Sequence, residues 1–247
     1  MSNKRIYGLI GKSLGHSFSR QYFNNKFLKE GINAEYVNFE LPDILDFPAI
    51  TLNKEICGLN VTIPYKSVIM PLLDEIDDTA RAIGAVNVIK LYHTDNATRT
   101  KGFNSDYIGF RDSIRPLLTH HRQALILGTG GASLAVAYAL RQLDINVQFV
   151  SRTAKDGILS YGQLTEEIIR QTDIIVNTTP LGMFPDIHSC PNIPYTAISS
   201  RHLCYDLTYN PEETLFLQKA KQQGAAIING EQMLINQAIE SWKIWHE

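Results

Sequence analysis

The stretch Gly58–Lys66 places a lysine directly after an apolar run that is typical of a buried strand. Apolar side chains alternate with polar ones from Leu59 to Ile63, and the strand is predicted to end at Pro64, which cannot donate to the ladder. Burial shifts the pKa of lysine readily, so Lys66 in a cleft could serve as a general acid or base. Taken alone, such a lysine is more typical of a solvated helix start.

A glycine-rich loop lies between an apolar strand pattern and an apolar helix pattern. In this context glycines allow a tight turn and let a pyrophosphate approach the helix amino terminus. Ser133 occupies the place of the third glycine in Gly-x-Gly-x-x-Gly, but it is small enough for close helix packing. A glycine turn that binds no ligand is the alternative. The predicted dinucleotide site consists of Gly128, Thr129, Gly130, Gly131 and Ala132.

The turn after the next predicted strand indicates which dinucleotide is bound. NAD-selective folds of this type usually place an acidic residue there, against the ribose 2′-hydroxyl. This chain has Ser151, Arg152, Thr153 and Lys155 instead, two cations and two hydroxyl groups. Arginine can grip a phosphate through two parallel hydrogen bonds, so the turn predicts NADP rather than NAD. A solvated basic turn, with Asp156 nearby, is the alternative.

Two further segments carry groups suited to a small polar substrate. Ser17 and Ser19 bracket the start of a predicted helix, where hydroxyl and backbone N–H groups could hold a carboxylate. Helix capping would also explain Ser17. Asp106 begins another predicted helix, either as an acid that meets the substrate or as an ordinary helix-start carboxylate.

The elements that must position these residues form two α/β groups. The first has strand patterns at residues 6–10, 36–39, 56–62, 86–92 and 98–103. Its helix patterns span 17–30 and 67–83, the second broken at Pro71. A polar turn makes the last two strands read as a hairpin, which predicts a mixed sheet. We therefore expect a substrate-binding catalytic domain over residues 1–104.

The second group begins with a sharper strand, glycine loop, helix, strand pattern. Strands are predicted at 124–127, 147–150, 174–176, 202–207 and 227–228, and helices at 105–118, 133–143 and 231–245. This predicts a Rossmann-type dinucleotide-binding domain over residues 105–230. The terminal segment 231–247 is expected to pack back on the first domain. The fold class is α/β.

Eight segments, in order along the chain, resemble the shikimate dehydrogenase family. They are His16–Ser19, Asn60–Lys66, Gly84–Asn87, Asn104–Asp106, Gly128–Ala132, Asn177–Met183, Asp206–Tyr209 and Gly230–Leu234 followed by Gln237. Any one could occur by chance, but eight in order are specific, and the resemblance extends nearly end to end.

The resemblance implies NADPH-dependent reduction of 3-dehydroshikimate to shikimate, a step of aromatic amino-acid biosynthesis. It makes Lys66 and Asp106 the catalytic pair. The positions that match residues around the substrate are Ser17, Ser19, Thr62, Lys66, Asn87, Asp106, Tyr209 and Gln237. Further positions that match residues around the cofactor are Asp78, Thr178, Leu207 and Gly230.

Three positions depart from the family pattern. Arg20 stands where the family usually has proline, Phe23 replaces a common histidine, and Ser151 replaces the asparagine before the phosphate-binding arginine. The first two lie one turn beyond the carboxylate site and could alter its fit. The family also includes paralogues that accept quinate or use NAD, so one alternative is a quinate or shikimate dehydrogenase that uses NAD or both cofactors. Another is a methylene-tetrahydrofolate dehydrogenase, which also pairs an α/β substrate domain with a Rossmann domain and uses a lysine. The third is a non-catalytic regulator that binds NADP or shikimate.

Composition limits the partners. The chain has 247 residues, 44% hydrophobic content and a net charge of −2 without a basic run, which argues against nucleic-acid binding. Apolar runs fall short of the roughly 18 residues of a membrane span, and a polar start precedes too short an apolar stretch for a signal peptide. We expect a cytoplasmic monomer or homodimer with a small-molecule substrate.

The cysteines and histidines predict neither disulfides nor a metal site. Cys57, Cys190 and Cys204 are odd in number and widely spaced, so we expect reduced, buried thiols. The adjacent His120 and His121 would point to different faces of a helix or strand.

Overall fold

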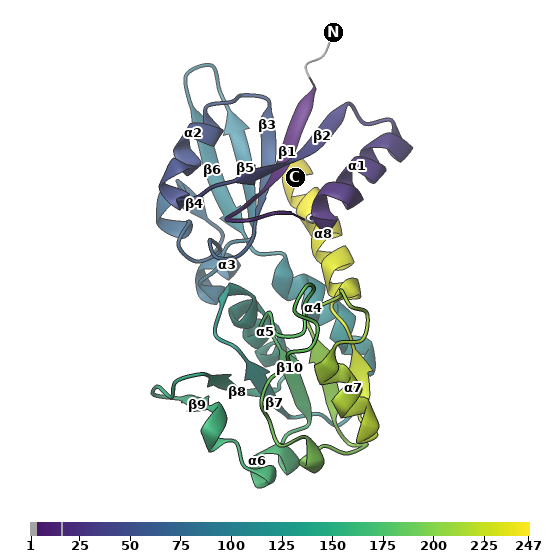
Figure 1. The fold of residues 1–247 in the computed structure, drawn as a ribbon. Helices are drawn as coiled ribbons and strands as arrows, with labels where there is room; N and C mark the ends of the chain where they lie inside the picture. Colours follow the sequence, from purple (N-terminus) through teal and green to yellow (C-terminus); the bar gives the residue numbers. More distant parts are fainter. Residues whose placement is uncertain (1–3, 16) are drawn as a thin grey trace. The chain divides into compact units, whose positions relative to one another are not determined.

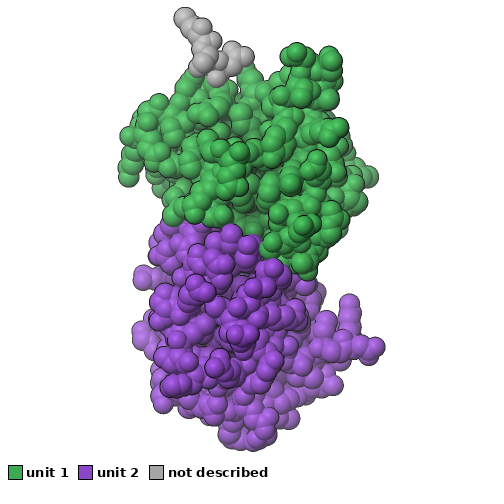
Figure 2. All heavy atoms as spheres, turned by 180° about the vertical axis from the view of Figure 1, so that it is seen from behind, with its two compact units in different colours: residues 1–105, 238–247 green, residues 106–237 purple. Residues whose placement is uncertain are grey.

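The computed structural model describes residues 4–15 and 17–247, which form two compact units (Figure 2). Unit 1 consists of the described residues up to Ser105 together with Ala238–Glu247, and unit 2 is Asp106–Gln237. Each unit has a six-stranded sheet with helices packed on both faces (Figure 1). His16, part of a segment matched above, lies outside the described residues.

The sheet of unit 1 is mixed, as predicted, with the strand order β2-β1-β3-β5-β6-β4. Parallel pairing joins β1 to β2 and β3, while β5 runs antiparallel to β3 and β6. The carboxyl ends of β1, β3 and β6 therefore meet the start of β5 at one edge of the sheet. The strands are β1 (Arg5–Gly11), β2 (Ala34–Glu40), β3 (Ile56–Val61), β4 (Glu75–Ile76), β5 (Val88–His93) and β6 (Thr98–Phe103).

Helices cover both faces of this sheet. On one face, α1 (Phe18–Glu30) and the end of α8 (Glu231–His246) pack an aromatic core that includes Phe23, Tyr36 and Trp245. On the other face lie α2 (Phe47–Thr51) and α3 (Asp78–Ile83), which follow the short 3-10 turns η1 (Ile44–Asp46) and η2 (Met70–Leu72).

The predicted helix over residues 67–83 is wrong. The structure has the turn η2, then the short strand β4, and only α3 is α-helical. Proline at the second position of η2 removes a helical hydrogen bond. The pairing of Glu75 with Lys101 on β6 then supplies the backbone bonds that a helix would have made.

The sheet of unit 2 is parallel throughout, in the order β12-β11-β10-β7-β8-β9. Both faces are covered, which explains why its central strands read as continuous apolar runs. The strand order reverses between β7 and β10, the place where doubly wound folds bind ligands. The strands are β7 (Gln123–Leu127), β8 (Asn146–Ser151), β9 (Ile158–Ser160), β10 (Ile174–Asn177), β11 (Leu203–Asp206) and β12 (Ala226–Ile228).

Two layers of helices enclose this sheet. One face is covered by α4, α5 and the start of α8, and the other by α6 and α7. The elements are α4 (Asp106–Ile114), η3 (Arg115–Leu117), α5 (Gly131–Arg141), η4 (Tyr161–Gln163), α6 (Glu166–Arg170), η5 (Tyr195–Ala197) and α7 (Leu215–Gln222).

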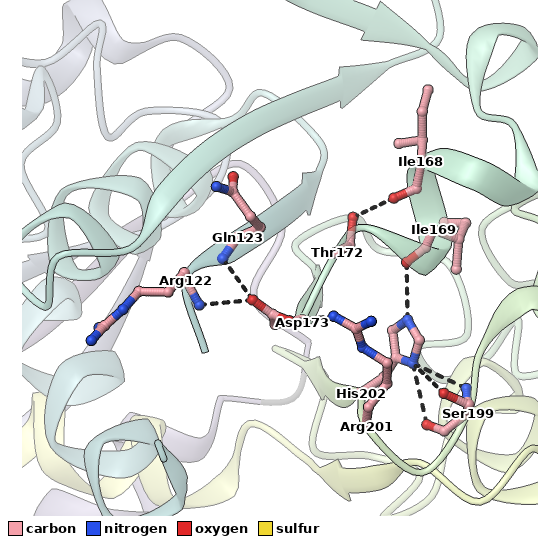
Figure 3. A network of polar contacts seen from close by, with 9 residues as sticks. All are labelled: Arg122, Gln123, Ile168, Ile169, Thr172, Asp173, Ser199, Arg201 and His202. Carbon is pink, nitrogen blue, oxygen red and sulfur yellow. Dashed lines mark hydrogen bonds and ion pairs between the residues drawn. The ribbon is translucent and has the colours of Figure 1, made fainter. Parts of the chain in front are cut away.

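Polar side chains join the amino ends of the central strands of unit 2 (Figure 3). The Asp173 carboxylate accepts hydrogen bonds from the backbone amides of Arg122 and Gln123 at 2.8 and 3.0 Å, and pairs with the Arg201 guanidinium at 2.9 Å. His202 accepts from the Ser199 amide at Nδ1, so its Nε2 carries the proton and donates to the Ile169 carbonyl at 2.9 Å. These contacts satisfy groups that the strand starts would otherwise leave unpaired.

Two predictions of burial are wrong. Ile63 is 66% exposed, because β3 ends at Val61 and the apolar alternation does not reach it. All three cysteines are thiols, but only Cys204 is buried, while Cys57 and Cys190 are partly exposed.

Candidate functional site

Lys66 lies five residues beyond the end of β3, in a segment fixed from both sides. The Tyr65 hydroxyl donates to the Leu41 carbonyl at 2.5 Å, and the Lys66 carbonyl accepts from the Val86 amide at 2.7 Å. The Lys66 side chain is half-buried. Its backbone is therefore held between two loops of unit 1. Thr62, also half-buried, begins the same segment and bonds through its amide to Ile10.

Ser17 caps α1, and Ser19 lies in its first turn. The Ser17 hydroxyl accepts a hydrogen bond from the Arg20 amide at 3.1 Å, the geometry of an N-cap. Ser19 is buried, with 8% of its surface exposed. Ser17 therefore has a structural partner, whatever else it binds.

Asn87 precedes β5 at the sheet edge where β1, β3 and β6 end. Its Oδ1 accepts from the Ser105 amide at 2.6 Å, and its Nδ2 donates to the Ser105 hydroxyl at 3.0 Å. A backbone amide can only donate, so the orientation of the Asn87 side chain is fixed. Asn87 is 2% exposed, so the positions of its polar atoms are determined by this neighbour.

Three other predicted substrate residues lie in unit 2. Asp106 is the first residue of α4 and is 5% exposed. Gln237 on α8 is 6% exposed and donates to the Leu234 carbonyl at 2.8 Å. Tyr209 follows β11 and is 37% exposed, and burial of part of its ring raises the pKa of its phenol.

The glycine loop follows β7 at the point where the strand order of unit 2 reverses. Gly128 has φ +118°, and a Cβ there would meet the Thr178 hydroxyl at 2.5 Å, so only glycine fits. Gly130 is the N-cap of α5 without a side-chain cap, and both Thr129 and Gly130 are exposed. Gly131 and Ala132 open the helix, whose backbone amides suit a phosphate.

Thr178, Leu207 and Gly230 line neighbouring loops at the same carboxyl edge. The Thr178 hydroxyl donates to the Leu127 carbonyl at 2.8 Å, which ties the loop after β10 to the end of β7. The Leu207 amide bonds to the Asn177 carbonyl at 3.0 Å. A Cβ on Gly230 would stand 2.0 Å from the Leu207 carbonyl oxygen, so the two backbones approach too closely for any side chain.

Asp206, the last residue of β11, joins these loops through hydrogen bonds to its side chain. Its carboxylate accepts from the Thr214 hydroxyl at 2.6 Å, the Thr208 amide at 2.9 Å and the Asn177 side chain at 3.1 Å. Asp206 is 0% exposed, and this burial raises the pKa of its carboxyl although the three donors oppose the rise.

The basic turn follows β8 at the same edge. The Ser151 hydroxyl donates to the Thr153 carbonyl, and Lys155 pairs with Ile158 through two backbone hydrogen bonds, so the turn is closed. Arg152, Thr153 and Lys155 are all exposed. The donors of this turn are available to an anionic ligand. The glycine cradle and the basic turn together fit a phosphorylated dinucleotide.

Asp78 differs from the other cofactor candidates in its place. It is an exposed residue in the first turn of α3, in unit 1, whereas all the other cofactor candidates belong to unit 2. The capping carboxylate of that helix is Asp77, which accepts from Thr79 and Ala80.

The structure shows the contacts of the three residues that depart from the family pattern. Arg20 is exposed, and its amide binds the Ser17 hydroxyl. Phe23 is fully buried and stacks on the Tyr36 ring, with centroids 4.9 Å apart and planes 11° apart. Ser151 orders the basic turn through its bond to Thr153.

Sequence reasoning missed Tyr36, Ser241 and the role of Asp206. Ser241 is fully buried on α8 and lies one turn after Gln237, so two polar residues at positions i and i+4 interrupt an apolar helix. That spacing is the sequence feature that could have identified Ser241. No such feature marks Tyr36, because tyrosine is common in strands.

Two negative findings concern the described residues. Within residues 4–15 and 17–247, no helix is long and apolar enough to cross a membrane. The same residues contain no group of three or more His, Cys, Asp or Glu side chains that could hold a metal ion.

A parallel sheet with a glycine turn at its switch point defines a dinucleotide-binding protein of the Rossmann class. Residues 9–89 match the family model of the shikimate dehydrogenase substrate binding domain. A shikimate dehydrogenase (NADP(+)) of Methanosphaera stadtmanae is 38% identical over 260 residues, which cover 97% of this chain and 90% of the relative. The chain belongs to the shikimate dehydrogenase family.

Solved structures share the whole fold. A shikimate dehydrogenase in complex with NADP+ is 35% identical, with a TM-score of 0.87 over 98% of this chain and 90% of that one. The quinate dehydrogenase from Corynebacterium glutamicum in complex with NAD is 25% identical, with a TM-score of 0.85 over 98% of this chain and 93% of that one.

Proposed function

We propose that this protein catalyses the NADPH-dependent, reversible reduction of 3-dehydroshikimate to shikimate, a step of aromatic amino-acid biosynthesis. The observation that carries the proposal is full-length membership of the family, with polar residues present at every matched catalytic position. A regulator without activity would not need Lys66 and Asp106 together.

When bound, NADPH supplies the hydride for the ring ketone. Charge then develops on the ketone oxygen, so a proton donor must lie within about 2.6 to 3.2 Å of it. In this proposal Lys66 donates that proton. Asp106 accepts a hydrogen bond from the neighbouring ring hydroxyl and pairs with Lys66, which orients both groups.

The remaining residues bind the substrate or the cofactor. Ser17 and Ser19 bind the substrate carboxylate, with Thr62 and Tyr209 beside the ring, while Asn87 and Gln237 bind ring hydroxyls. Asn87 suits this role because its two bonds to Ser105 fix the direction in which its amide faces. The phosphates of the cofactor lie on the loop Gly128–Ala132 and its 2′-phosphate on the turn Ser151–Lys155. Its nicotinamide lies near Leu207 and Gly230, and Thr178 is a further cofactor contact. Asp78 is the remaining proposed cofactor contact.

Initial rates with shikimate and quinate, each with NADP and NAD, test the substrate and the cofactor. We expect turnover with shikimate and NADP to exceed the other three combinations. Quinate and NAD are the relevant rivals because a solved quinate dehydrogenase with NAD shares the fold. If the protein binds NADP or shikimate but turns over none of the four combinations, it is a non-catalytic regulator. Turnover of a folate would make it a methylene-tetrahydrofolate dehydrogenase instead.

Replacing Lys66 tests the mechanism. Lys66→Ala should lower kcat by about 10²- to 10⁴-fold, the usual contribution of a positioned acid or base. Because a proton donor acts only in the transition state, kcat and kcat/KM should fall by similar factors. With Asp106→Asn, the double variant should lose much less than the product of the single losses, since paired groups act as a unit. Nearly full kcat in Lys66→Ala would refute the assignment.

Ser17 has an observed cap bond, so its binding role needs a separate test. Losing the cap in Ser17→Ala costs about 1 kcal/mol and lowers Tm by only a few degrees. If Ser17 and Ser19 also bind the carboxylate, replacing both by Ala should raise the KM for shikimate strongly. An unchanged KM with a lowered Tm would reduce Ser17 to a cap.

We also propose that the enzyme is cytoplasmic and a monomer or homodimer. The three cysteines, all free thiols as expected in a reducing compartment, support the first statement. Light scattering after gel filtration measures the second.

A further inference from the structure

A chain of buried hydrogen bonds crosses unit 1 behind the proposed substrate residues. The Tyr36 hydroxyl donates to Oδ1 of Asn60 at 2.8 Å, and Nδ2 of Asn60 donates to the Ser241 hydroxyl at 3.0 Å. The hydroxyls of Ser241 and Ser105 lie 3.2 Å apart, and the Ser105 hydroxyl accepts a hydrogen bond from Nδ2 of Asn87 at 3.0 Å. Tyr36, Ser105 and Ser241 are 0% exposed.

Backbone groups determine the orientation of the Asn60 and Asn87 amides, while either of the Ser105 and Ser241 hydroxyls can donate to the other. Nδ2 of Asn60 also donates to the Asn87 carbonyl at 3.2 Å, and a carbonyl can only accept. Oδ1 of Asn60 must therefore face Tyr36, which donates to it. Neither the Asn60 nor the Asn87 amide can flip without breaking a buried hydrogen bond.

We propose that Tyr36 and Ser241 are positioning residues for the reaction, and this inference rests on the proposed function. Tyr36 fixes the amide of Asn60, which holds the Asn87 backbone. Ser241 links Asn60 to Ser105, which holds the Asn87 side chain. Two residues that meet no substrate thereby set the direction of the donor that Asn87 presents to a ring hydroxyl.

The packing of Tyr36 supports a positioning role. Its ring stacks on Phe23 and lies 6.4 Å from the ring of Trp245, so the phenol cannot swing away from Asn60. Burial keeps the pKa of Tyr36 well above its usual 10, so the group stays a donor at any working pH. All five side chains of the chain from Tyr36 to Asn87 are neutral, and their effect on the reaction should not depend on pH.

The test compares this chain with a matched buried pair in unit 2. Tyr205 is also 0% exposed, and its hydroxyl lies 2.9 Å from the hydroxyl of Ser113 on α4. Tyr205→Phe and Ser113→Ala remove the same groups as Tyr36→Phe and Ser241→Ala. They do so in the core of unit 2, whereas Asn87 belongs to unit 1. Steady-state rates with shikimate and NADP, the Kd for NADP and urea unfolding are measured for all four variants.

Tyr36→Phe and Ser241→Ala should each lower kcat/KM for shikimate by about 5- to 150-fold, because each leaves a buried group unpaired. Their Kd for NADP should stay within about twofold of the wild type. The two control variants should lose similar stability but keep kcat/KM. The double variant Tyr36→Phe, Ser241→Ala should lose less than the product of the single losses, since both act through Asn60.

Unchanged kcat/KM in folded Tyr36→Phe, which keeps the ring, would overturn the positioning role even if Ser241→Ala fails to fold. Equal losses of kcat/KM in the four variants would overturn it too, since general destabilisation would then explain them. Absence of shikimate turnover in the wild type would overturn the proposed function, and the positioning role with it. Turnover in the wild type with unaffected variants would overturn only the latter.

Discussion

The two ends of the parallel sheet in unit 2 each carry a carboxylate that several donors share, but with opposite electrostatics. At the amino end, burial alone would raise the pKa of Asp173, yet the Arg122 and Gln123 amides and the Arg201 guanidinium outweigh burial and lower it. At the carboxyl end, burial dominates and raises the pKa of Asp206. Its hydrogen-bond donors are the neutral groups of Thr214, Thr208 and Asn177.

The difference follows from what each end does. The amino end joins strand starts in contact with water, where an arginine can approach the carboxylate. At the carboxyl end, loops must leave their surface to a ligand, so the carboxylate that orders them lies beneath, away from water. A buried charge without a cation is costly, and the sheet tolerates it where the loops of Thr178 and Leu207 need a common acceptor.

Between the two ends of this sheet, the largest expected effect on stability is that of Asp206→Ala. Three buried donors would lose their acceptor, and each unpaired group costs about 1 to 3 kcal/mol, so we expect at least about 3 kcal/mol of lost stability. The loops it orders should also loosen, raising the Kd for NADP by about tenfold. Urea unfolding and cofactor titration measure the two effects. Asp173→Ala is the matched control, and an equal change in its Kd for NADP would remove the distinction between the ends.

Arginines at the two ends give the next contrast. Arg152→Ala should weaken NADP by about 10- to 150-fold, since each charge-assisted bond lost is worth roughly 1.5 to 3 kcal/mol. NAD lacks the 2′-phosphate and should be little affected. Arg122, exposed at the amino end, provides the control, and Arg122→Ala should leave both affinities unchanged. Equal weakening of NAD and NADP by Arg152→Ala would contradict the proposed phosphate contact.

Sequence predicts the carboxyl end better than the amino end. The apolar run of β7, the glycines and the basic turn are adjacent in the chain, so local patterns give the strand, loop, helix order and the candidate ligand groups. The donors to Asp173 come from residues 28 to 51 positions away, which no local pattern reveals. Asp206 stands within a matched segment, but its burial depends on the helices that cover the sheet.

The same limit explains what was missed in unit 1. Lys66 and Asn87 each belong to a recognisable segment. The bond between Asn60 and Ser241 spans 181 positions, and the strand β4 forms only because β6 is beside it. Such contacts arise from tertiary packing, which overrides local preference, as the incorrect helix over 67–83 illustrates.

The smallest expected effect concerns the dependence of stability on pH, and it separates the two carboxylates by sign. The pKa of Asp173 is lower in the folded state than the unfolded value of about 3.9, so its stabilising effect is complete above that pH and is lost as pH falls through the folded pKa. The pKa of Asp206 is raised, so its ionisation destabilises the fold increasingly as pH rises from about 4 through the folded pKa.

Urea unfolding of the wild type, Asp173→Asn and Asp206→Asn between about pH 3 and pH 7 measures both slopes. Asp173→Asn should cost about 1 kcal/mol at neutral pH, because Arg201 is largely exposed and its ion pair is weak. That loss should shrink towards pH 3, whereas the stability of Asp206→Asn relative to the wild type should rise with pH. If both variants shift stability by amounts that do not change with pH, neither carboxylate has the altered pKa on which the contrast between the two ends depends.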